Sequence, residues 1–376
     1  MTAPAPGTPI AAVDTPALVI DLEAMRRNLA AMASFAREHH VRLRPHAKLH
    51  KSALLAKLQI EAGAVGVCVQ KLSEAEVLAE RGIGDIFISN EVIDAAKLER
   101  LAALATRIKL AVAVDSALGI ERLAAALKAR GASADVFVEI DVGQGRCGVA
   151  PAAAGALAHQ VVSHGLRFAG LHAYHGKAQH LRSAAEREAA LRHAVALVRA
   201  AQAGITRAGI ACPLVTGAGT GTFVHEAASG VYGELQCGSY LFMDRDYAEN
   251  EATPHAPRFE HALFVKSQVI SRGSAHAVVD AGHKAHAIDS GLPKVWQRDD
   301  LEFGNGGDEH GILRLRASHG SNAAAPLPDL GDTVWLVPGH CDPTVNLHDR
   351  YVVVRGGLAE GVVDAVWPID ARGCVS

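Results

Sequence analysis

Short apolar runs and amphipathic stretches alternate along the chain up to about residue 250. The apolar runs, rich in Val, Ile and Ala, recur roughly every 20 to 30 residues, and the stretches 22–38, 72–81 and 116–130 carry apolar residues at helical spacing. Strands separated by helices need crossover connections, so they pair in parallel. About eight such units fit before residue 250, which predicts a (β/α)₈ TIM-type barrel. A doubly wound sheet is the main alternative, disfavoured because the first strand-to-helix turn lacks a G-x-G-x-x-G motif.

Beyond Pro257 the apolar runs follow one another without helical stretches, as in HALFVKSQVISR, DTVWLVPG and RYVVVRGG. Turn residues such as Asn305-Gly306-Gly307 separate them, which is typical of antiparallel pairing. We therefore expect a flexible N-terminal tail over residues 1–12, a barrel over 13–254 and a mostly antiparallel C-terminal β domain over 255–376.

Charge and composition narrow the class of ligand. The chain has 37 Lys and Arg against 40 Asp and Glu, a formal net charge of -3, so it has no basic field for nucleic acid or anionic lipid. No apolar stretch is long enough to span a bilayer, and the N-terminus lacks the pattern of a secretory signal. The six cysteines have no C-x-x-C spacing, which favours reduced thiols and a cytoplasmic location. A small molecule is the expected substrate.

Three basic residues, Arg44, His46 and Lys48, alternate along the second apolar run. In an extended strand all three point to one side, and Lys48 comes last, at the end of the strand where barrel active sites lie. Cationic neighbours and partial burial are expected to lower the pKa of Lys48 and free its amine to attack an aldehyde. The alternative is an exposed basic stripe on a solvated edge strand.

A glycine-rich segment, TGAGTG at 216–221, follows a later strand. Its glycines allow the backbone to approach a ligand closely, and successive amides can cradle a phosphate. A purely structural turn is an equal alternative, and no Gly-Lys-Ser/Thr follows, which disfavours a nucleotide triphosphate. The segment 236–240 is a candidate for the other side of the cradle. The residues expected to bind here are Thr216, Gly219, Thr220, Gln236, Gly238, Ser239 and Tyr240.

The sequence PGHCDPT places His340 and Asp342 two residues apart after an apolar run. In an extended backbone both would reach the same side, where they could share a metal ion. A His and carboxylate pair without thiolate favours Mn²⁺ or Mg²⁺ over sulfur-bound Zn²⁺. Incidental polar residues in a loop are the alternative. Arg146, His172, Tyr174 and His180 are further candidates because they lie near strand ends.

With these residues in view, the chain resembles the fold-type III pyridoxal-phosphate enzymes of the D-threonine aldolase and D-serine dehydratase group, whose barrel is similar to that of alanine racemase. The resemblance is carried by RPHAKLHK, EIDVGQGRCGV, GLHAYHGKAQH, TGAGTGT and GHCDPTVNLHD. It implies that Lys48 bonds the cofactor aldehyde, that Arg146 and Tyr174 lie beside the cofactor, and that His340 and Asp342 bind a metal. It also implies a homodimer.

Within that group the dehydratases resemble one another in a His-x-Cys pair, whereas the aldolases have His-x-Asp, as here. The resemblance therefore implies retro-aldol cleavage of D-β-hydroxy amino acids, such as D-threonine to glycine and acetaldehyde, with pyridoxal 5'-phosphate and a divalent cation. Tyr174 and His180 are the expected catalytic partners of Lys48, with His180 as the base. The alternatives are cleavage of 3-hydroxy-D-aspartate to glycine and glyoxylate, β-elimination from D-serine or D-threo-3-hydroxyaspartate, racemisation, and a non-catalytic pyridoxal-phosphate carrier.

Overall fold

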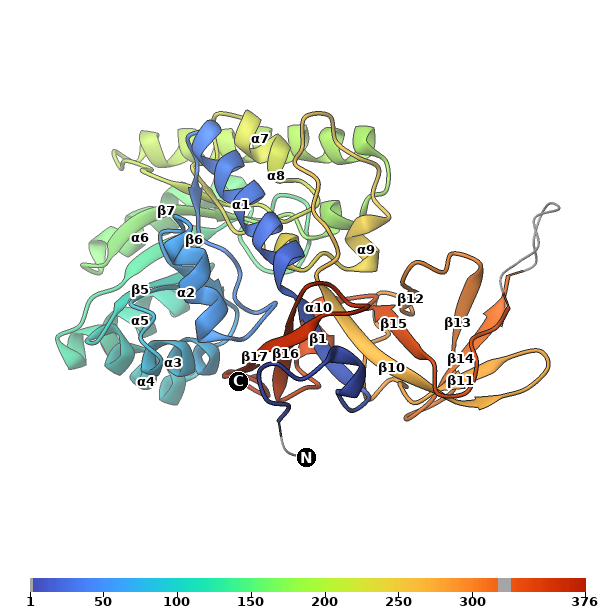
Figure 1. Ribbon diagram of the computed structural model, residues 1–376. Coiled ribbons are helices and arrows are strands. Elements are labelled where there is room, and N and C mark those ends of the chain that lie inside the picture. The colour runs from blue at the N-terminus through green and yellow to red at the C-terminus, as the bar shows by residue number, and fades with distance from the viewer. Residues whose placement is uncertain (1–2, 317–325) are drawn as a thin grey trace.

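The computed structural model describes residues 3–316 and 326–376, which form a barrel and a β domain side by side (Figure 1). The barrel strands are β2 (Arg42–Leu43), β3 (Val67–Val69), β4 (Asp85–Glu91), β5 (Lys109–Val114), β6 (Asp135–Glu139), β7 (Arg167–Ala173), β8 (Val215–Gly217) and β9 (Glu234–Leu235). They pair in parallel in the order β2-β9-β8-β7-β6-β5-β4-β3. A bridge between His46 and Cys68 joins the segment after β2 to β3, so the ladder closes on itself. The predicted barrel is confirmed.

Both faces of the barrel strands are buried, which explains their nearly continuous apolar sequence. Inside the barrel, small and aromatic side chains form a buried cluster that includes Phe87, Ala111 and Phe137. Outside, the strands pack against helices, whose apolar faces complete a separate core. Helix ends follow the local sequence. Ser116 accepts a hydrogen bond from the amide of Gly119 at the start of α5, and Gly131 ends that helix in the left-handed conformation.

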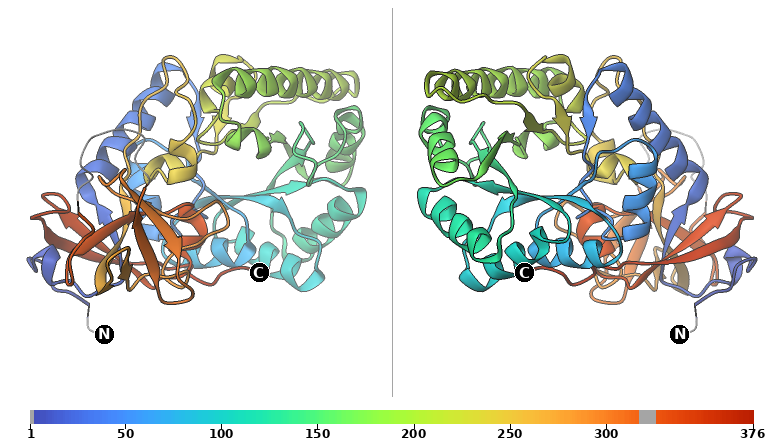
Figure 2. Two further views of the ribbon diagram at one scale, coloured as in Figure 1. Left: turned by 90° about the vertical axis from the view of Figure 1, so that its right-hand side faces the viewer. Right: turned by 90° about the vertical axis from the view of Figure 1, so that its left-hand side faces the viewer.

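The first 3-10 turn, η1 (Ile10–Ala12), packs against the β domain. The helices of the barrel unit are α1 (Leu22–Glu38), α2 (Ala53–Glu61), α3 (Leu72–Glu80), α4 (Ala95–Ala105), α5 (Ala117–Arg130), α6 (Ala154–Ser163), α7 (Ala184–Arg207), α8 (Phe223–Ala228) and α9 (Arg245–Ala248), with 3-10 turns η2 (Pro151–Ala153), η3 (Lys177–His180) and η4 (Ser239–Leu241). They surround the barrel strands, and the long α7 crosses one side of the barrel (Figure 2). Of the helices that the structure describes, none has the length and apolarity needed to cross a bilayer.

The β domain contains β10 (Leu263–Arg272), β11 (Ala277–Val279), β12 (Lys294–Val295), β13 (Leu301–Asn305), β14 (Gly311–Leu315), β15 (Thr333–Val337), α10 (Cys341–Val345), β16 (Arg350–Arg355) and β17 (Val362–Pro368). The main path of its sheet runs β13-β14-β11-β10-β1-β16-β17, and β15 pairs with β10 and β12. All of these pairs are antiparallel except that between β1 and β16, which agrees with the expected mostly antiparallel domain.

The boundary expected at residue 13 is wrong, because β1 (Ala17–Asp21) belongs to the sheet of the β domain rather than to the barrel. It pairs antiparallel with β10 and parallel with β16, and β9 takes the eighth place in the barrel. The run ALVID is buried at its centre in this sheet, as a barrel strand would be. A short apolar run has the same pattern in either sheet, so periodicity could not assign it.

The flexible tail expected over residues 1–12 is also contradicted for residues 3–12. Ile10 is only 2% exposed and packs in a cluster with Val19 and Val352. The amide of Gly7 donates a hydrogen bond to the carbonyl of Val363 at 2.8 Å. Burial of one apolar side chain and pairing with β17 are enough to order this polar, proline-containing segment.

The C-terminal end of the chain returns to the barrel and contacts the turn after β2. Lys51 Nζ donates to Glu74 Oε1 at 2.7 Å and to the carbonyl of Cys374 at 3.0 Å, and the amide of Ala371 donates to the carbonyl of Lys51 at 2.9 Å. Tyr351 Oη donates to the carbonyl of His50 at 2.7 Å. The turn after β2 is therefore held from both units.

Replacing Gly170 by Ala is expected to destabilise the barrel strongly. Gly170 lies in β7 at φ +139°, and an added Cβ would lie 1.8 Å from the carbonyl oxygen of Leu214. We expect Gly170→Ala to lower the free energy of unfolding by at least about 3 kcal/mol in urea titrations. Gly165→Ala is the matched control, because Gly165 has φ +77° but no atom within 4 Å of the added Cβ, and should cost only about 1 kcal/mol. Equal losses for both variants would contradict the steric argument.

Candidate active site

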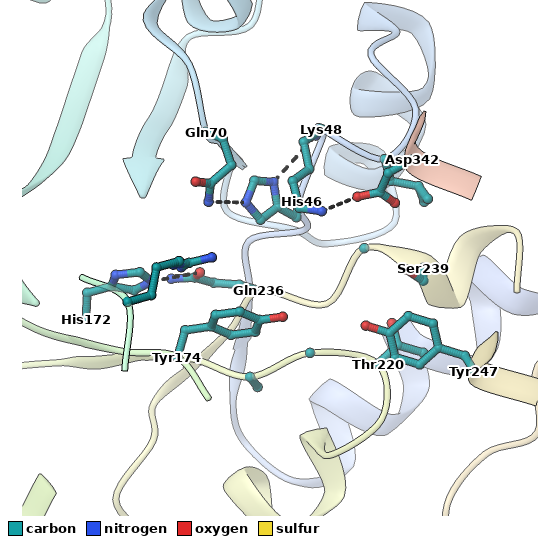
Figure 3. Close-up of a pocket in the computed structure, with 15 residues that line it drawn as sticks. His46, Lys48, Gln70, His172, Tyr174, Thr220, Gln236, Ser239, Tyr247 and Asp342 are labelled. Carbon is teal, nitrogen blue, oxygen red and sulfur yellow. Dashed lines mark hydrogen bonds and ion pairs between the residues drawn. The ribbon is translucent and has the colours of Figure 1, made fainter. Parts of the chain in front are cut away.

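A pocket of about 300 Å³ opens at the carboxyl ends of the barrel strands, where the β domain meets the barrel. Figure 3 shows Lys48 and Asp342 meeting on one side of it, with His172 and Gln236 on one flank and Thr220 and Ser239 on the opposite flank. The volume lies at the lower end of the range for small-molecule sites. Its lining residues are His46, Lys48, Leu49, Gln70, Arg146, His172, Tyr174, Ala218, Gly219, Thr220, Gln236, Gly238, Ser239, Tyr247 and Asp342.

Lys48 lies in the turn after β2 rather than in the strand, and its ammonium forms an ion pair with Asp342. The expected lowering of its pKa is contradicted in this structure. Burial alone would lower the pKa of Lys48, but the negative charge and hydrogen bond of Asp342 raise it above its ordinary value. The same pair holds the pKa of Asp342 at about 2, although burial opposes this. The sequence showed the basic neighbours of Lys48 but not the carboxylate that arrives from the other domain.

His46 and Arg44 do not add positive charge to the pocket. Burial, followed by the charge of Lys48, lowers the pKa of His46 well below its ordinary value, so this imidazole is neutral. His46 Nδ1 accepts a hydrogen bond from the amide of Lys48 at 3.4 Å, which fixes the turn. Arg44 lies deeper and pairs with Glu234 at 3.1 Å and with Asp85 at 2.6 Å. The three basic residues therefore have different roles: Arg44 forms buried ion pairs, His46 fixes the turn, and Lys48 presents an amine to the pocket.

The flank formed by the glycine-rich segment and η4 fits a phosphate group. Within residues 3–316 and 326–376, the backbone amides of Gly219, Thr220, Gly238 and Ser239 donate no hydrogen bond to another protein group. Ala218, directly before Gly219, has a φ of +75°, the left-handed conformation that turns successive amides toward one side. Four unpaired donors beside two hydroxyl side chains are the arrangement that binds a phosphate dianion.

Two residues expected in this cradle do not line the pocket. Thr216 is fully buried within the barrel, where its hydroxyl lies 3.0 Å from Glu234 Oε1 and 2.8 Å from Gln236 Nε2. Tyr240 packs in the core, and its hydroxyl accepts from Gln59 Nε2 at 3.1 Å. Its amide donates to Thr220 Oγ1, so Tyr240 supports the cradle through its backbone. Strand alternation could not show that Thr216, within β8, forms its hydrogen bonds inside the barrel, or that Tyr240, in η4, packs in the core.

The other expected cofactor contacts do line the pocket. Tyr174 lies at its centre in Figure 3, and the guanidinium of Arg146 lies 5.9 Å from the centroid of the Tyr174 ring. Gln236 reaches the pocket from the segment after β9. Gln70 and Tyr247 also line the pocket but were not predicted. Gln70 ends the run AVGVCVQ, so the rule that active-site residues follow barrel strands could have found it.

His340 and Asp342 meet at the start of α10, with 3.8 Å between His340 Nε2 and Asp342 Oδ1. The backbone is helical from Cys341, so the expected extended geometry is wrong, although the two side chains still converge. Asp342 Oδ1 is buried and has no hydrogen-bond partner in the described part of the chain, which fits a bound cation. Asp289, which was not predicted, accepts from His340 Nδ1 at 2.7 Å and leaves Nε2 facing the carboxylate.

These residues provide two ligands rather than a complete metal cage. No group of three or more His, Cys, Asp or Glu side chains with metal-binding geometry occurs among residues 3–316 and 326–376. Water or substrate oxygen atoms would have to complete the coordination, as they do at sites that keep open positions for chemistry.

His180 is near the pocket but does not line it. Its Nδ1 lies 2.5 Å from Asp246 Oδ2, and its ring centroid is 5.8 Å from that of Tyr247, which does line the pocket. Burial would raise the pKa of Asp246, but the hydrogen bonds from His180 and Arg182 lower it, so Asp246 is a carboxylate that holds His180 Nδ1 as a donor. His180 Nε2 is then the nitrogen available to accept a proton.

A buried network supports the glycine-rich segment from behind. Gln179 Oε1 accepts a hydrogen bond from the amide of Gly221 at 2.9 Å. A Cβ added to Gly219 would lie only 2.4 Å from this same oxygen. Gln179 Nε2 donates to Thr222 Oγ1 at 2.7 Å, and that hydroxyl donates to Glu226 Oε1 at 2.8 Å. Glycine is required at position 219 because Gln179 fills the space behind it.

Comparison with known proteins defines the class first. Residues 20–246 match the family model "Alanine racemase, N-terminal domain", and residues 262–354 match the model "Putative serine dehydratase domain". The chain belongs to the alanine racemase N-terminal domain family. The barrel of this family is thus joined here to a β domain of the serine dehydratase type.

Comparison with individual proteins shows which members of the family this chain is similar to. The D-threonine aldolase of Arthrobacter sp is 46% identical over 372 residues, which cover 98% of this chain and 95% of that protein. The 3-hydroxy-D-aspartate aldolase of Paracoccus denitrificans (strain Pd 1222) is 43% identical over 378 residues, covering 98% and 94% of the two chains. The crystal structure of D-threonine aldolase from Filomicrobium marinum superposes with a TM-score of 0.94 at 49% identity, and 100% of each chain is covered.

Glu226 is expected to make the stability of the protein depend on pH. Burial raises the pKa of Glu226 from 4.5 to about 8, against the hydrogen bond from Thr222. The native state therefore keeps a proton that the unfolded chain releases, so the free energy of unfolding should fall as pH rises through this range. Relative to the parent, Glu226→Gln should gain roughly 1 kcal/mol per pH unit in urea titrations between about pH 5 and 8. Glu121→Gln, at an exposed position of α5, is the control with no such trend. A parallel pH profile for Glu226→Gln would show that Glu226 is ionised in the native state.

Proposed function

We propose that the protein cleaves D-β-hydroxy amino acids by a retro-aldol reaction, using pyridoxal 5'-phosphate and a divalent cation. The observation that carries the proposal is the meeting of the Lys48 amine, four unpaired backbone amides and the His340–Asp342 pair around one pocket of about 300 Å³. The names of the two aldolases that share more than 40% of its sequence support the same reaction.

The pocket has a place for each part of the cofactor. When bound, pyridoxal phosphate supplies an aldehyde that takes up amines and a conjugated ring that accepts electrons from the α-carbon of an amino acid. Lys48 would hold the aldehyde, the amides of Gly219, Thr220, Gly238 and Ser239 would hold the phosphate, and Arg146 and Tyr174 would flank the ring. Lys48 must lose a proton before it can bond an aldehyde, and the adjacent Asp342 carboxylate can relay that proton to solvent.

His340 and Asp342 would hold the divalent cation, which as a Lewis acid lowers the pKa of a coordinated hydroxyl group. The nitrogen and carboxylate ligands favour Mn²⁺ or Mg²⁺. His180 is the proposed base, because Asp246 fixes its tautomer and leaves Nε2 free to take the proton of the substrate hydroxyl. The ring of His180 contacts that of Tyr247, which lines the pocket, so His180 lies at the edge of the pocket.

The preferred substrate within this class is part of the proposal. D-threonine is our first choice and 3-hydroxy-D-aspartate the second, since relatives named for each cover 98% of the chain. β-Elimination is disfavoured because position 342 is Asp rather than the Cys that the resemblance associates with dehydratases. A cofactor carrier is disfavoured because α10 brings His340 and Asp342 to the pocket, which a carrier would not need. A homodimer in the cytoplasm stays a prediction.

Product analysis tests the reaction. The purified protein with pyridoxal phosphate and Mn²⁺ should convert D-threonine or D-3-hydroxyaspartate to glycine and an aldehyde, and borohydride should fix the cofactor to Lys48, as peptide mass spectrometry would show. Lys48→Ala should lose both activity and fixation, because Lys48 is the lysine that lines the pocket in the described part of the chain. Lys57→Ala, on the outer α2, is the control. Ammonia and a 2-oxo acid as products, or fixation at another lysine, would refute the proposal.

Asp342→Asn tests the metal site separately from the cofactor. The amide keeps the shape but loses the charge that holds a cation, so Mn²⁺ affinity and activity should each fall by about 10- to 100-fold. Calorimetric titration with Mn²⁺ and activity assays after chelator treatment measure the two effects. Asp349→Asn, an exposed carboxylate of the same segment, should leave both unchanged. Full activity of the parent protein after rigorous metal removal would exclude the cation from the reaction.

A further inference from the structure

His172 lies under the pocket with both ring nitrogens in hydrogen-bonding contact. It is 1% exposed at the end of β7, yet its edge lines the pocket. Nδ1 lies 2.8 Å from Glu139 Oε2. Nε2 lies 3.3 Å from Gln236 Oε1 (Figure 3). The charge of His172 therefore depends on which of these neighbours can donate a proton.

The orientation of the Gln236 amide is fixed by a chain of hydrogen bonds that ends at the acceptor Glu234. Glu234 forms ion pairs with Arg42 at 2.8 Å and Arg44 at 3.1 Å, so it is a carboxylate and can only accept. The Thr216 hydroxyl, 3.0 Å from Glu234 Oε1, has one proton and must donate it there. Thr216 can then only accept from Gln236, which requires the Gln236 NH₂ group on that side.

With its NH₂ group committed to Thr216, Gln236 presents its carbonyl oxygen to His172. This oxygen has no proton, so His172 Nε2 must donate. On the other side, Glu139 presents a carboxylate oxygen to Nδ1, which makes Nδ1 a donor as well. We propose that His172 is a permanent imidazolium at the floor of the pocket, held by Glu139 and Gln236 as a fixed positive charge.

The charged groups around His172 agree with this assignment. Burial would lower the pKa of His172, but Glu139 raises it above its ordinary value, and Glu91 adds to the effect. Glu139 keeps a lowered pKa against burial, mainly through His172, and Arg146 also favours its charged form. Burial, then the charge of Glu139, raises the pKa of Glu91 to about 7.

The other neighbours of His172 are a neutral histidine and an aromatic ring, while the guanidinium of Arg146 lies near Glu139. His46 faces His172 from the segment after β2 and is neutral, as argued above. Phe87 of β4 presents its ring to the imidazole edge-on, with 5.5 Å between centroids. With a pKa of about 7, Glu91 is partly ionised near neutral pH, so the carboxylates Glu139 and Glu91 face the positive charges of His172 and Arg146.

The role of this charge rests on the proposed function. An anionic cofactor with an electron-accepting ring is stabilised by a fixed cation in a site of low dielectric constant. His172 also holds the Gln236 carbonyl away from the pocket centre, so it acts as a positioning residue for Gln236. Its charge is a property of the protein alone and can be measured without the cofactor.

Ring-¹⁵N histidine spectra of the full-length, cofactor-free protein test the charge directly. The signals of His172, assigned by their loss in His172→Asn, should show both nitrogens protonated from about pH 5.5 to about pH 8.5, without a titration step. In Glu139→Gln the carboxylate is lost at constant size, so His172 should titrate within this range. A single protonated nitrogen in the parent protein at neutral pH would overturn the proposal, whether or not the protein binds pyridoxal phosphate.

Cofactor binding tests the role. Glu139→Gln should raise the dissociation constant of pyridoxal phosphate about tenfold and shift the absorption band of the bound cofactor, which a loss of packing alone would not do. Glu302→Gln, at an exposed position of β13, is the control for both readouts. If Glu139→Gln leaves the affinity and the band unchanged while His172 titrates, the charge is confirmed and its role toward the cofactor is rejected. Should His172→Asn fail to fold, Glu139→Gln identifies the His172 signals by their new pH dependence.

Discussion

The ion pair of Lys48 with Asp342 is the interaction on which the arrangement of the two units depends. Its amine comes from the turn after β2, and its carboxylate comes from α10 of the β domain. The barrel alone provides a nucleophile and a cradle, and the β domain alone provides two polar ligands. Because one carboxylate faces both the amine and His340, displacement of the ammonium by a cofactor would leave Asp342 available for a cation. Under the proposed function, covalent chemistry at Lys48 and binding of a cation would be coupled at the single side chain of Asp342.

The barrel interior must also satisfy its own buried charges. Its lower layers are apolar, whereas the layer below the pocket holds a continuous chain from Arg44 through Glu234, Thr216 and Gln236 to His172. Unpaired charges at this depth would cost several kcal/mol each. Each residue of this network therefore has a hydrogen-bond or ion-pair partner that also fixes its orientation. The hydrogen bonds that make burial of these polar groups tolerable also make the floor of the pocket rigid.

The sequence predicted what depends on local pattern and position along the chain. It gave the barrel, the β domain and the lining roles of Lys48, Arg146 and Tyr174, because these follow from periodicity and strand ends. It could not place β1, since a short apolar run suits either sheet. It also missed the raised pKa of Lys48, because the responsible carboxylate is almost 300 residues away. The burial of Thr216 within β8 and of Tyr240 in η4 is likewise not encoded in local alternation.

In the proposed site, backbone amides bind the cofactor and a few side chains act on the substrate. For this reason the type of reaction is hard to predict from the sequence alone. The proposed phosphate cradle is built from amides, which depend on the conformation around Ala218 and not on side-chain identity. Many sequences with the same turn would therefore bind the same cofactor. Reaction type must then be set by the few side chains that vary near the α- and β-carbons of the substrate, among which Asp342 and His340 are the ones supplied by a separate domain. Under the proposed function, the choice between cleavage and elimination would therefore rest on His340 and Asp342 at the start of α10, while the barrel would serve either reaction.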